Sequence, residues 1–296
     1  MVGLGAVGGL VAGALQKAGH HVSALTSPDH RHALADRGYT VYSPRFGDFR
    51  VNPIVLERLE IPCDTIFICV KAYRLERALR AIDAGRIGDA TVVPLLNGLE
   101  HMAVLRGLFE PSRVLAGSIG RIETKRAAFD VVIHSNPDAR VWLAGLPEAA
   151  GRVEAVASLL RSARFDVDIV ADESTLLWGK LVRLAPLACL TAASGLTLGE
   201  VRSAEPWRSA LEEAVAETVA AARAHGVELS VDAMLELIAG LPGHISTSMA
   251  RDIEAGRPSE LDAIAGAVRR AAADVGLTCP TLEAMAERAA GVRATS

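Results

Sequence analysis

Cysteine is scarce in this chain. The 296 residues include four cysteines, Cys63, Cys69, Cys189 and Cys279, and no two of them have the short spacing of a zinc-ligand pair. Scattered cysteines of this kind indicate neither a disulfide framework nor a zinc site, so we expect no metal. They fit a protein of the reducing cytoplasm, which is the location that we predict.

The chain also lacks an excess of charge of either sign. Its formal net charge is −4, and it contains no long run of basic residues. A protein that binds nucleic acid usually carries a basic patch or stripe, because it must neutralise phosphates. We therefore expect no nucleic-acid partner.

No apolar stretch has the features of a secretion signal or a membrane span. The apolar N-terminus lacks the basic segment that leads a secretion signal. Residues 181–198 are mostly apolar, but Arg183 and Pro186 interrupt them, which favours a buried helix. We therefore expect no membrane partner.

What the chain does have is a glycine-rich start, Gly3-Leu4-Gly5-Ala6-Val7-Gly8. Residues 9–18 follow with a helical pattern and residues 21–25 with a strand pattern, which together make most of a βαβ unit. In such units the glycines let backbone N–H groups approach a pyrophosphate at the helix N-terminus. The pattern predicts that all six residues contact a dinucleotide. Because only Met1 and Val2 precede Gly3, the first strand looks cut short, and Met1 is not the start we would expect of the natural chain.

The pattern of elements changes along the chain and predicts two domains. In the first part, short apolar runs alternate with helical stretches, which is typical of an α/β Rossmann-type domain with a mostly parallel sheet. After Asp172 strand-like runs are almost absent, and the second part is predicted to be an all-α domain. We predict a dinucleotide-binding domain over residues 1–171 and a helical substrate and catalytic domain over residues 172–296, with the substrate in a cleft between them. The predicted strands are residues 65–70, 91–96, 114–119, 131–134, 141–144 and 167–170, and the predicted helices are residues 74–84, 148–163, 173–193, 206–225, 231–239 and 259–275.

Five later segments, taken with the glycine-rich start, resemble the ketopantoate reductase family over nearly the whole chain. They are Val70-Lys71-Ala72-Tyr73, Pro94-Leu95-Leu96-Asn97-Gly98, Leu177-Trp178-Gly179-Lys180-Leu181, Ser248-Met249-Ala250-Arg251-Asp252 and Gly256-Arg257-Pro258-Ser259-Glu260-Leu261-Asp262. The resemblance implies an NADPH-dependent oxidoreductase that reduces a small-molecule 2-oxo acid. It makes 2-dehydropantoate (ketopantoate), a precursor in pantothenate biosynthesis, the leading substrate.

The resemblance also implies roles for individual residues. It makes Lys180 the catalytic acid and Glu260 the residue that supports the reaction centre. Lys71 and Asn97 match positions that contact cofactor or substrate, and Ser248 matches a position that binds the substrate carboxylate.

The residues themselves support some of these roles and leave others open. Lys180 has mostly apolar neighbours, so desolvation should lower its pKa toward that of a general acid at neutral pH; the alternative is a lysine that extends to solvent. An acid at the start of a helix such as Glu260 is also favoured by the helix dipole alone. Asp252 follows Ser248 by four residues and is predicted to orient its hydroxyl, or else to be a surface charge. Asn97 and Lys71 each end an inner strand, where parallel sheets bind ligands, although Asn97-Gly98 is also an ordinary turn signal.

The preferred cofactor is NADPH. An acidic residue at the end of the second strand would favour NAD, and Leu25-Thr26-Ser27 contains none. Arg31 is the nearest arginine that could hold a 2′-phosphate. Asp29 keeps NADH open as the second choice.

The substrate is less closely defined, because Leu184 and Ala188 stand where the family usually has asparagines that bind substrate. Arg183 lies one turn after Lys180, so we predict that it binds a carboxylate. The alternatives are a relative that reduces another 2-oxo acid or an opine-type substrate, and a non-catalytic NADP(H)-binding sensor. A homodimer also stays open, with the Ala-rich residues 211–224 as a candidate dimer face.

Overall fold

The computed structural model describes residues 1–34, 37–120 and 122–291, which divide into two compact units. The first unit comprises Met1–Leu96 and His101–Leu176, and the second comprises Asn97–Glu100 and Leu177–Ser296. The assignment of dinucleotide binding to residues 1–171 and of substrate binding to residues 172–296 stays a prediction.

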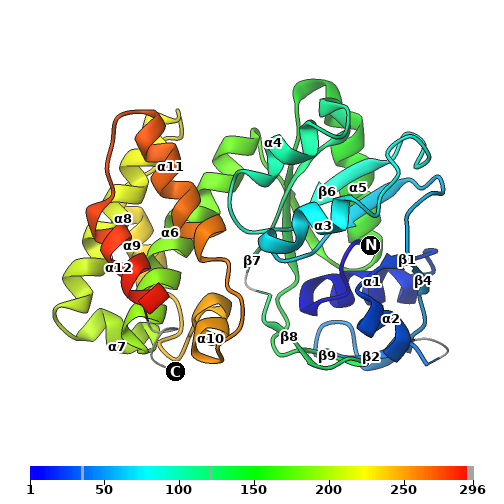
Figure 1. The fold of residues 1–296 in the computed structure, drawn as a ribbon, viewed down its shortest axis with the longest axis horizontal. Coiled ribbons are helices and arrows are strands. Elements are labelled where there is room, and N and C mark those ends of the chain that lie inside the picture. Colours follow the sequence, from blue (N-terminus) through cyan, green and yellow to red (C-terminus); the bar gives the residue numbers. More distant parts are fainter. Residues whose placement is uncertain (35–36, 121, 292–296) are drawn as a thin grey trace. The chain divides into compact units, whose positions relative to one another are not determined.

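The first unit is built on a largely parallel sheet (Figure 1). Val2 forms parallel bridges to Leu25 and to Ile68, so it lies between two strand pairs. A further bridge from Val92 to Val114 leads toward the remaining strands, of which β7 and β10 are antiparallel and β10 and β11 parallel. In order across the unit the strands are β4 (Ile54–Leu56), β1 (Ser23–Leu25), β5 (Thr65–Ile68), β6 (Thr91–Pro94), β7 (Ala116–Gly120), β10 (Arg140–Ala144) and β11 (Asp166–Ile169). The Rossmann-type prediction is confirmed.

A second, smaller sheet covers the first helix, α1 (Ala6–Lys17). Its strand order is β3 (Phe49–Val51), β2 (Tyr39–Tyr42), β9 (Val131–His134) and β8 (Thr124–Ala128). The buried Tyr39 hydroxyl donates a hydrogen bond to the carbonyl of Gly9 at 2.7 Å. This contact fixes α1, and with it the glycine-rich turn (residues 3–8), against β2.

The remaining helices of the first unit are α2 (Pro28–Leu34), η1 (Ala72–Arg74), α3 (Leu75–Leu79), α4 (His101–Arg106), η2 (Pro111–Arg113), η3 (Pro147–Ala149) and α5 (Ala150–Ser162). The prediction of a helix over residues 74–84 is wrong at its end. The helix stops at Leu79 because Leu59 forms a parallel bridge with Ile82, donating to Ala81 O at 2.8 Å and accepting from Asp83 N at 2.9 Å. A tertiary backbone pairing therefore outcompetes the local helical pattern.

Among the described residues of the second unit, all the regular elements are helices, as predicted. It contains α6 (Glu173–Ser194, whose first turn belongs to the first unit), α7 (Leu198–Ser203), α8 (Trp207–Ala224), α9 (Val231–Ala239), α10 (Ser248–Glu254), the π-helical segment η4 (Asp262–Gly266), α11 (Ala267–Asp274) and α12 (Pro280–Gly291).

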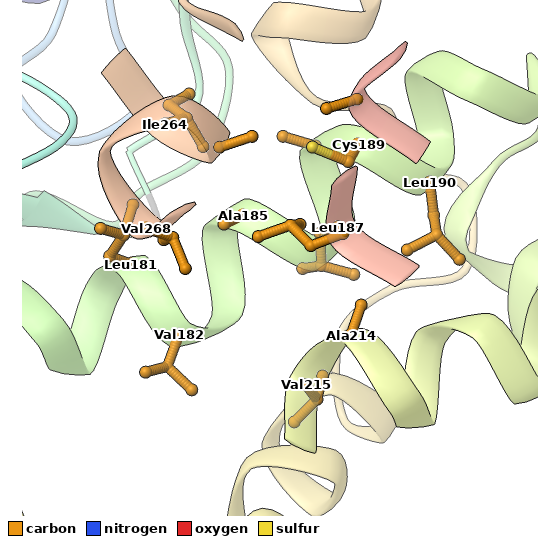
Figure 2. Close-up of a cluster of buried hydrophobic side chains, with 14 of the residues drawn as sticks. Leu181, Val182, Ala185, Leu187, Cys189, Leu190, Ala214, Val215, Ile264 and Val268 are labelled. Carbon is orange, nitrogen blue, oxygen red and sulfur yellow. The ribbon is translucent and has the colours of Figure 1, made fainter. Parts of the chain in front are cut away.

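The core of the second unit forms around α6. Figure 2 shows part of this cluster, with Leu181 of α6, Ile264 of η4 and Val268 of α11 among the labelled side chains. Burying a leucine such as Leu181 stabilises the fold by about 1.5–3 kcal/mol. Among the described residues, α6 is the one helix long and apolar enough to span a membrane, and 72% of its apolar window is buried inside the protein. Such burial fits a core helix.

Helix α8 presents its apolar face to the same core. Leu211, Ala214, Val215, Val219 and Ala222 are all buried within the chain. This face is therefore not free to form a dimer contact, and a homodimer stays a prediction.

Candidate active site

The glycine-rich turn has the close backbone contacts that its sequence pattern predicts. Gly3 has φ +90°, a conformation that favours glycine. A Cβ at Gly8 would lie 1.9 Å from Gly3 O, so residue 8 must be glycine for α1 to pack on the turn. A Cβ at Gly5 would instead come no closer than 4.0 Å, to Cys69 O. The protein's own packing does not require the second glycine, so the turn keeps an open approach to its backbone.

This turn fits the phosphates of a dinucleotide. The N-terminus of α1 has no side-chain cap, and the first N–H groups of a helix need partners and attract anions. Ala6 and Val7 lie in this first turn, whereas the side chain of Leu4 is buried in the core. The six predicted cofactor contacts would therefore be made mainly by backbone groups.

Lys71 lies close to this turn in the chain that follows β5. Cys69 lies two residues before it, and a Cβ added to Gly8 would lie 2.9 Å from the Cβ of Cys69. The side chain of Val70 touches the turn in the same way, 2.7 Å from a Cβ on Gly3. The structure therefore brings the Lys71 segment to the glycine-rich turn, at the carboxyl end of β5.

Arg31 lies on α2, one turn after Ser27, and its backbone amide donates to Ser27 O at 2.9 Å. Its guanidinium forms an ion pair with the carboxylate of Glu57, which directly follows β4. The side chain of Asp29 lies outside the described part of the structure. Whether Arg31 holds a 2′-phosphate stays a prediction.

Lys180 is the central titratable group of the second unit. It lies on α6 beside the buried Leu181, and burial lowers the pKa of its amine to about 8. The negative charge of Glu260 acts against this shift, and the positive charge of Arg183 adds to it. An amine extended into bulk water would keep its usual pKa, so these surroundings favour the general-acid interpretation over a solvated lysine.

Glu260 is buried, with 4% of its surface exposed, directly before Leu261 and η4. Its Oε2 accepts a hydrogen bond from Asn97 Nδ2 at 3.2 Å. Because a buried carboxylate needs partners, the electrostatic contact with Lys180 and this hydrogen bond account for Glu260 better than a solvated helix-start acid does.

Asn97 belongs to a short segment that is held on η4 within the second unit. Gly98 has φ +91°, and a Cβ there would lie 2.3 Å from Ala263 O. Glu100 accepts two hydrogen bonds from Arg270, at 2.6 and 2.8 Å, and Arg270 also donates to Asp262 at 2.7 Å. The Asn97-Gly98 pair is therefore more than a connecting turn, since it carries an amide to Glu260.

Arg183 is half-buried on α6, and its Nε donates to Gly179 O at 3.3 Å. Desolvation lowers the pKa of its guanidinium. Leu184 packs against the helical core and Ala188 is fully buried, so neither offers a polar group. Together with Lys180, the segment presents two cations among apolar side chains.

Ser248 and Asp252 both lie on α10 and differ in their exposure. Ser248 is exposed at the first position of α10. Asp252 is half-buried and accepts a hydrogen bond from Arg257 Nε at 3.0 Å. Contact of Asp252 with the Ser248 hydroxyl, and with substrate, stays a prediction.

One basic residue at the glycine-rich turn was not predicted from the sequence. Arg126 lies on β8, and its Nη2 donates to Gly5 O at 3.5 Å. A Cβ at Gly9 would lie 2.7 Å from the same Nη2 atom. The signal for it is weak, because β8 is a polar segment without the alternation of a buried strand. It adds positive charge where phosphates are expected.

No group of three or more metal-ligating side chains occurs among the described residues, and the four cysteines are free thiols. Two groups of described residues could therefore bind ligands or take part in a reaction. In the first unit it is the glycine-rich turn with its basic neighbours, and in the second unit it is the group formed by Lys180, Glu260, Asn97 and Arg183.

Comparison with known proteins accounts for both units. The family model described as Ketopantoate reductase PanE/ApbA matches residues 1–148, and the model of its C-terminal part matches residues 174–292. The 2-dehydropantoate 2-reductase of Caulobacter vibrioides is 30% identical over 289 residues, covering 95% of this chain and 93% of the relative. The uncharacterized oxidoreductase YkpB of Bacillus subtilis is 26% identical over 290 residues, covering 96% of this chain and 94% of the relative.

Solved structures show the same architecture. A PanE/ApbA family ketopantoate reductase from Ralstonia eutropha JMP134 matches with a TM-score of 0.88 at 25% identity, covering 99% of each chain. A ternary structure of D-mandelate dehydrogenase with NADH and anilino(oxo)acetate matches with a TM-score of 0.89 at 18% identity, covering 99% of this chain and 98% of the other, a likeness of fold alone.

A glycine-rich turn on a Rossmann-type sheet is typical of dinucleotide-binding folds, and the relatives that match this chain over its whole length are oxidoreductases. Within that class, this chain belongs to the ketopantoate reductase family, whose members act on CH–OH groups.

Proposed function

We propose that this protein reduces a 2-oxo acid to the corresponding 2-hydroxy acid with NADPH, and that 2-dehydropantoate is the leading substrate. The observation that carries the proposal is the charge environment of Lys180. Burial lowers the pKa of its amine to about 8, and the negative charge of Glu260 acts against this shift. A general acid works best when its pKa lies near the working pH. The full-length match to 2-dehydropantoate 2-reductases supports the reaction class.

A nicotinamide cofactor held at the glycine-rich turn would supply a hydride to the ketone carbon of the substrate. The carbonyl electron pair then moves to oxygen, and Lys180 donates its proton to that oxygen, giving the hydroxyl and leaving a neutral amine. Before this transfer, the ammonium charge of Lys180 stabilises the developing alkoxide. Glu260 keeps Lys180 protonated near neutral pH, because its negative charge raises the pKa that desolvation lowers.

The other predicted residues bind and orient. The backbone of the glycine-rich turn holds the cofactor phosphates, and Lys71 and Arg126 contribute positive charge beside it. Arg183, whose guanidinium can pair with both oxygens of a carboxylate, anchors the acid group of the substrate. Asn97 orients the Glu260 carboxylate.

A second candidate is reduction of a 2-oxo acid with an apolar tail. Leu184 packs in the apolar core and Ala188 is buried, so these two positions provide no hydrogen bond for a substrate hydroxyl. A site that lacks such partners loses its preference for a hydroxylated substrate. This candidate keeps the chemistry and changes only the substrate side chain.

The test is to follow NADPH and NADH absorbance with a panel of 2-oxo acids that includes 2-dehydropantoate, using Lys180→Ala as the control. Turnover of 2-dehydropantoate supports the leading substrate, and turnover of apolar 2-oxo acids alone supports the second candidate. Tight NADPH binding with no oxidation by any acid contradicts both, and would leave the non-catalytic sensor.

A further inference from the structure

The register of β1 and β4 places an acidic residue, Glu57, beside the end of β1, although the two are far apart in the sequence. β1 and β4 pair in parallel with Leu25 opposite Leu56, so Thr26 and Glu57 are the first residues beyond the paired segment on each strand. Parallel strands end at the same edge, and Glu57 therefore lies beside Thr26 at the carboxyl edge of the sheet. In the βαβ unit that begins with the glycine-rich turn, β1 is the second strand, whose carboxyl end lies at the adenine ribose of a bound dinucleotide.

Arg31 lies at the same edge of the sheet. Its amide bonds to Ser27 O at 2.9 Å, which sets it one helical turn past the end of β1. Its guanidinium pairs with the carboxylate of Glu57. The two side chains are 36% and 73% exposed, so the pair lies where a ligand can reach it and where it can rearrange.

These two groups have opposite effects on the two forms of the cofactor. A 2′-phosphate is attracted by Arg31, but it is repelled by Glu57 and must compete with Glu57 for Arg31. A free ribose 2′-hydroxyl can instead donate a hydrogen bond to the carboxylate, as an acid at this position does in NAD-binding proteins.

We propose that Glu57 is a specificity-determining residue for the cofactor, because it competes with a 2′-phosphate for Arg31 and accepts a hydrogen bond from a free ribose hydroxyl. The protein then accepts NADH as well as NADPH, with a narrower preference for NADPH than Arg31 alone would give. This inference rests on the proposed function in one respect, namely that a dinucleotide binds at the glycine-rich turn.

The test measures binding, independently of turnover. The probes are 2′,5′-ADP, which carries the 2′-phosphate, and 5′-ADP, which does not, each titrated calorimetrically into the full chain. Glu57→Gln is the test variant because it removes the charge and keeps the shape. Glu60→Gln is the matched control, since Glu60 lies three residues further on and pairs with Arg58 at 2.6 Å.

We expect Glu57→Gln to bind 2′,5′-ADP about fivefold more tightly, which is the effect of one like charge a few ångströms away in water. Binding of 5′-ADP should stay the same or weaken. Arg31→Ala should lose affinity for 2′,5′-ADP alone, and Glu60→Gln should behave as the wild type does.

An unchanged ratio of the two affinities in Glu57→Gln, at a wild-type melting temperature, overturns the proposal. An equal loss of both affinities also overturns it, because that is the result of a purely structural role. Unchanged 2′,5′-ADP binding in Arg31→Ala would show that Arg31 does not bind the 2′-phosphate, and this result also overturns the proposal. If the wild type binds neither probe nor either dinucleotide, the proposed dinucleotide site itself fails, which is a distinct result.

Discussion

The amide of Asn97 donates to the carboxylate of Glu260 at 3.2 Å, although 163 residues separate them in the chain. This hydrogen bond joins the segment after β6 to Glu260, which lies two residues before η4. Since the negative charge of Glu260 also raises the pKa of Lys180, the three residues form one electrostatic group. The first predictions concern this group.

Replacing Lys180 with alanine should lower kcat about 10²- to 10⁴-fold, the usual contribution of a positioned general acid. Binding of NADPH, measured by fluorescence titration, should remain within about twofold of the wild type, which is well under 1 kcal/mol. A variant that keeps more than half of the wild-type kcat would contradict the role of Lys180 as proton donor.

The pH dependence of kcat should show an alkaline limb near the pKa of Lys180. Because the protonated amine is the active form, the rate should be full well below pH 8 and fall as the pH rises through about 8. Glu260→Gln removes the charge that raises this pKa, so its limb should move to lower pH. Arg183→Gln removes a charge that lowers it, so its limb should move to higher pH.

These two variants are each other's control. Shifts of the same sign would show that the pH profile reports a general disturbance and not the charge at Lys180. Arg183→Gln should also raise the Michaelis constant for the 2-oxo acid about tenfold or more, because a charged hydrogen-bonding partner is lost.

The two glycines of the turn should respond differently to alanine. Gly8→Ala puts a methyl group 1.9 Å from Gly3 O, so the free energy of unfolding should fall by at least about 2 kcal/mol in urea denaturation. Gly5→Ala has room for its methyl group and should change stability by less than about 0.5 kcal/mol.

Gly5→Ala should nevertheless weaken NADPH binding about tenfold or more, because the methyl group blocks close approach to the backbone. Normal NADPH affinity in a folded Gly5→Ala variant would show that the cofactor does not bind at this turn.

Arg270 should matter more for stability than its exposed position indicates. It donates two hydrogen bonds to Glu100 and three to Asp262, and such networks are more stabilising than single surface pairs. Since the three side chains are 47%, 51% and 84% exposed, solvent screening limits the expected loss in Arg270→Gln to about 1 kcal/mol of unfolding free energy. Arg269→Gln, which loses one exposed pair with Glu283, should change stability less.

Much of the architecture could be predicted because it follows local patterns. The strand at residues 131–134 and the helix at residues 231–239 have the predicted bounds, since each has a clear apolar period flanked by turn residues. The glycine-rich turn could also be predicted, because its residues are close in the chain, and Gly3 and Gly8 each have a steric reason to be glycine.

The parts that could not be predicted depend on contacts distant in sequence. β8 is polar and forms only because β9 pairs with it. The end of α3 depends on pairing between Leu59 and Ile82. Strand pairing places Glu57 near the end of β1 and Arg126 at the glycine-rich turn, and no local sequence pattern indicates either position.

The π-helical turn that follows Glu260 has a consequence for how the chain tolerates changes in length. A π-helix holds one residue more than an α-helix over the same rise, so deleting a single residue within Asp262–Gly266 would let an unbroken α-helix form. Each residue turns a helix by about 100°, and Glu260 would then be rotated out of its present orientation while the downstream core stayed in place. Deleting one residue from this π-helical turn should therefore lower the activity more than most substitutions nearby, while leaving a folded protein.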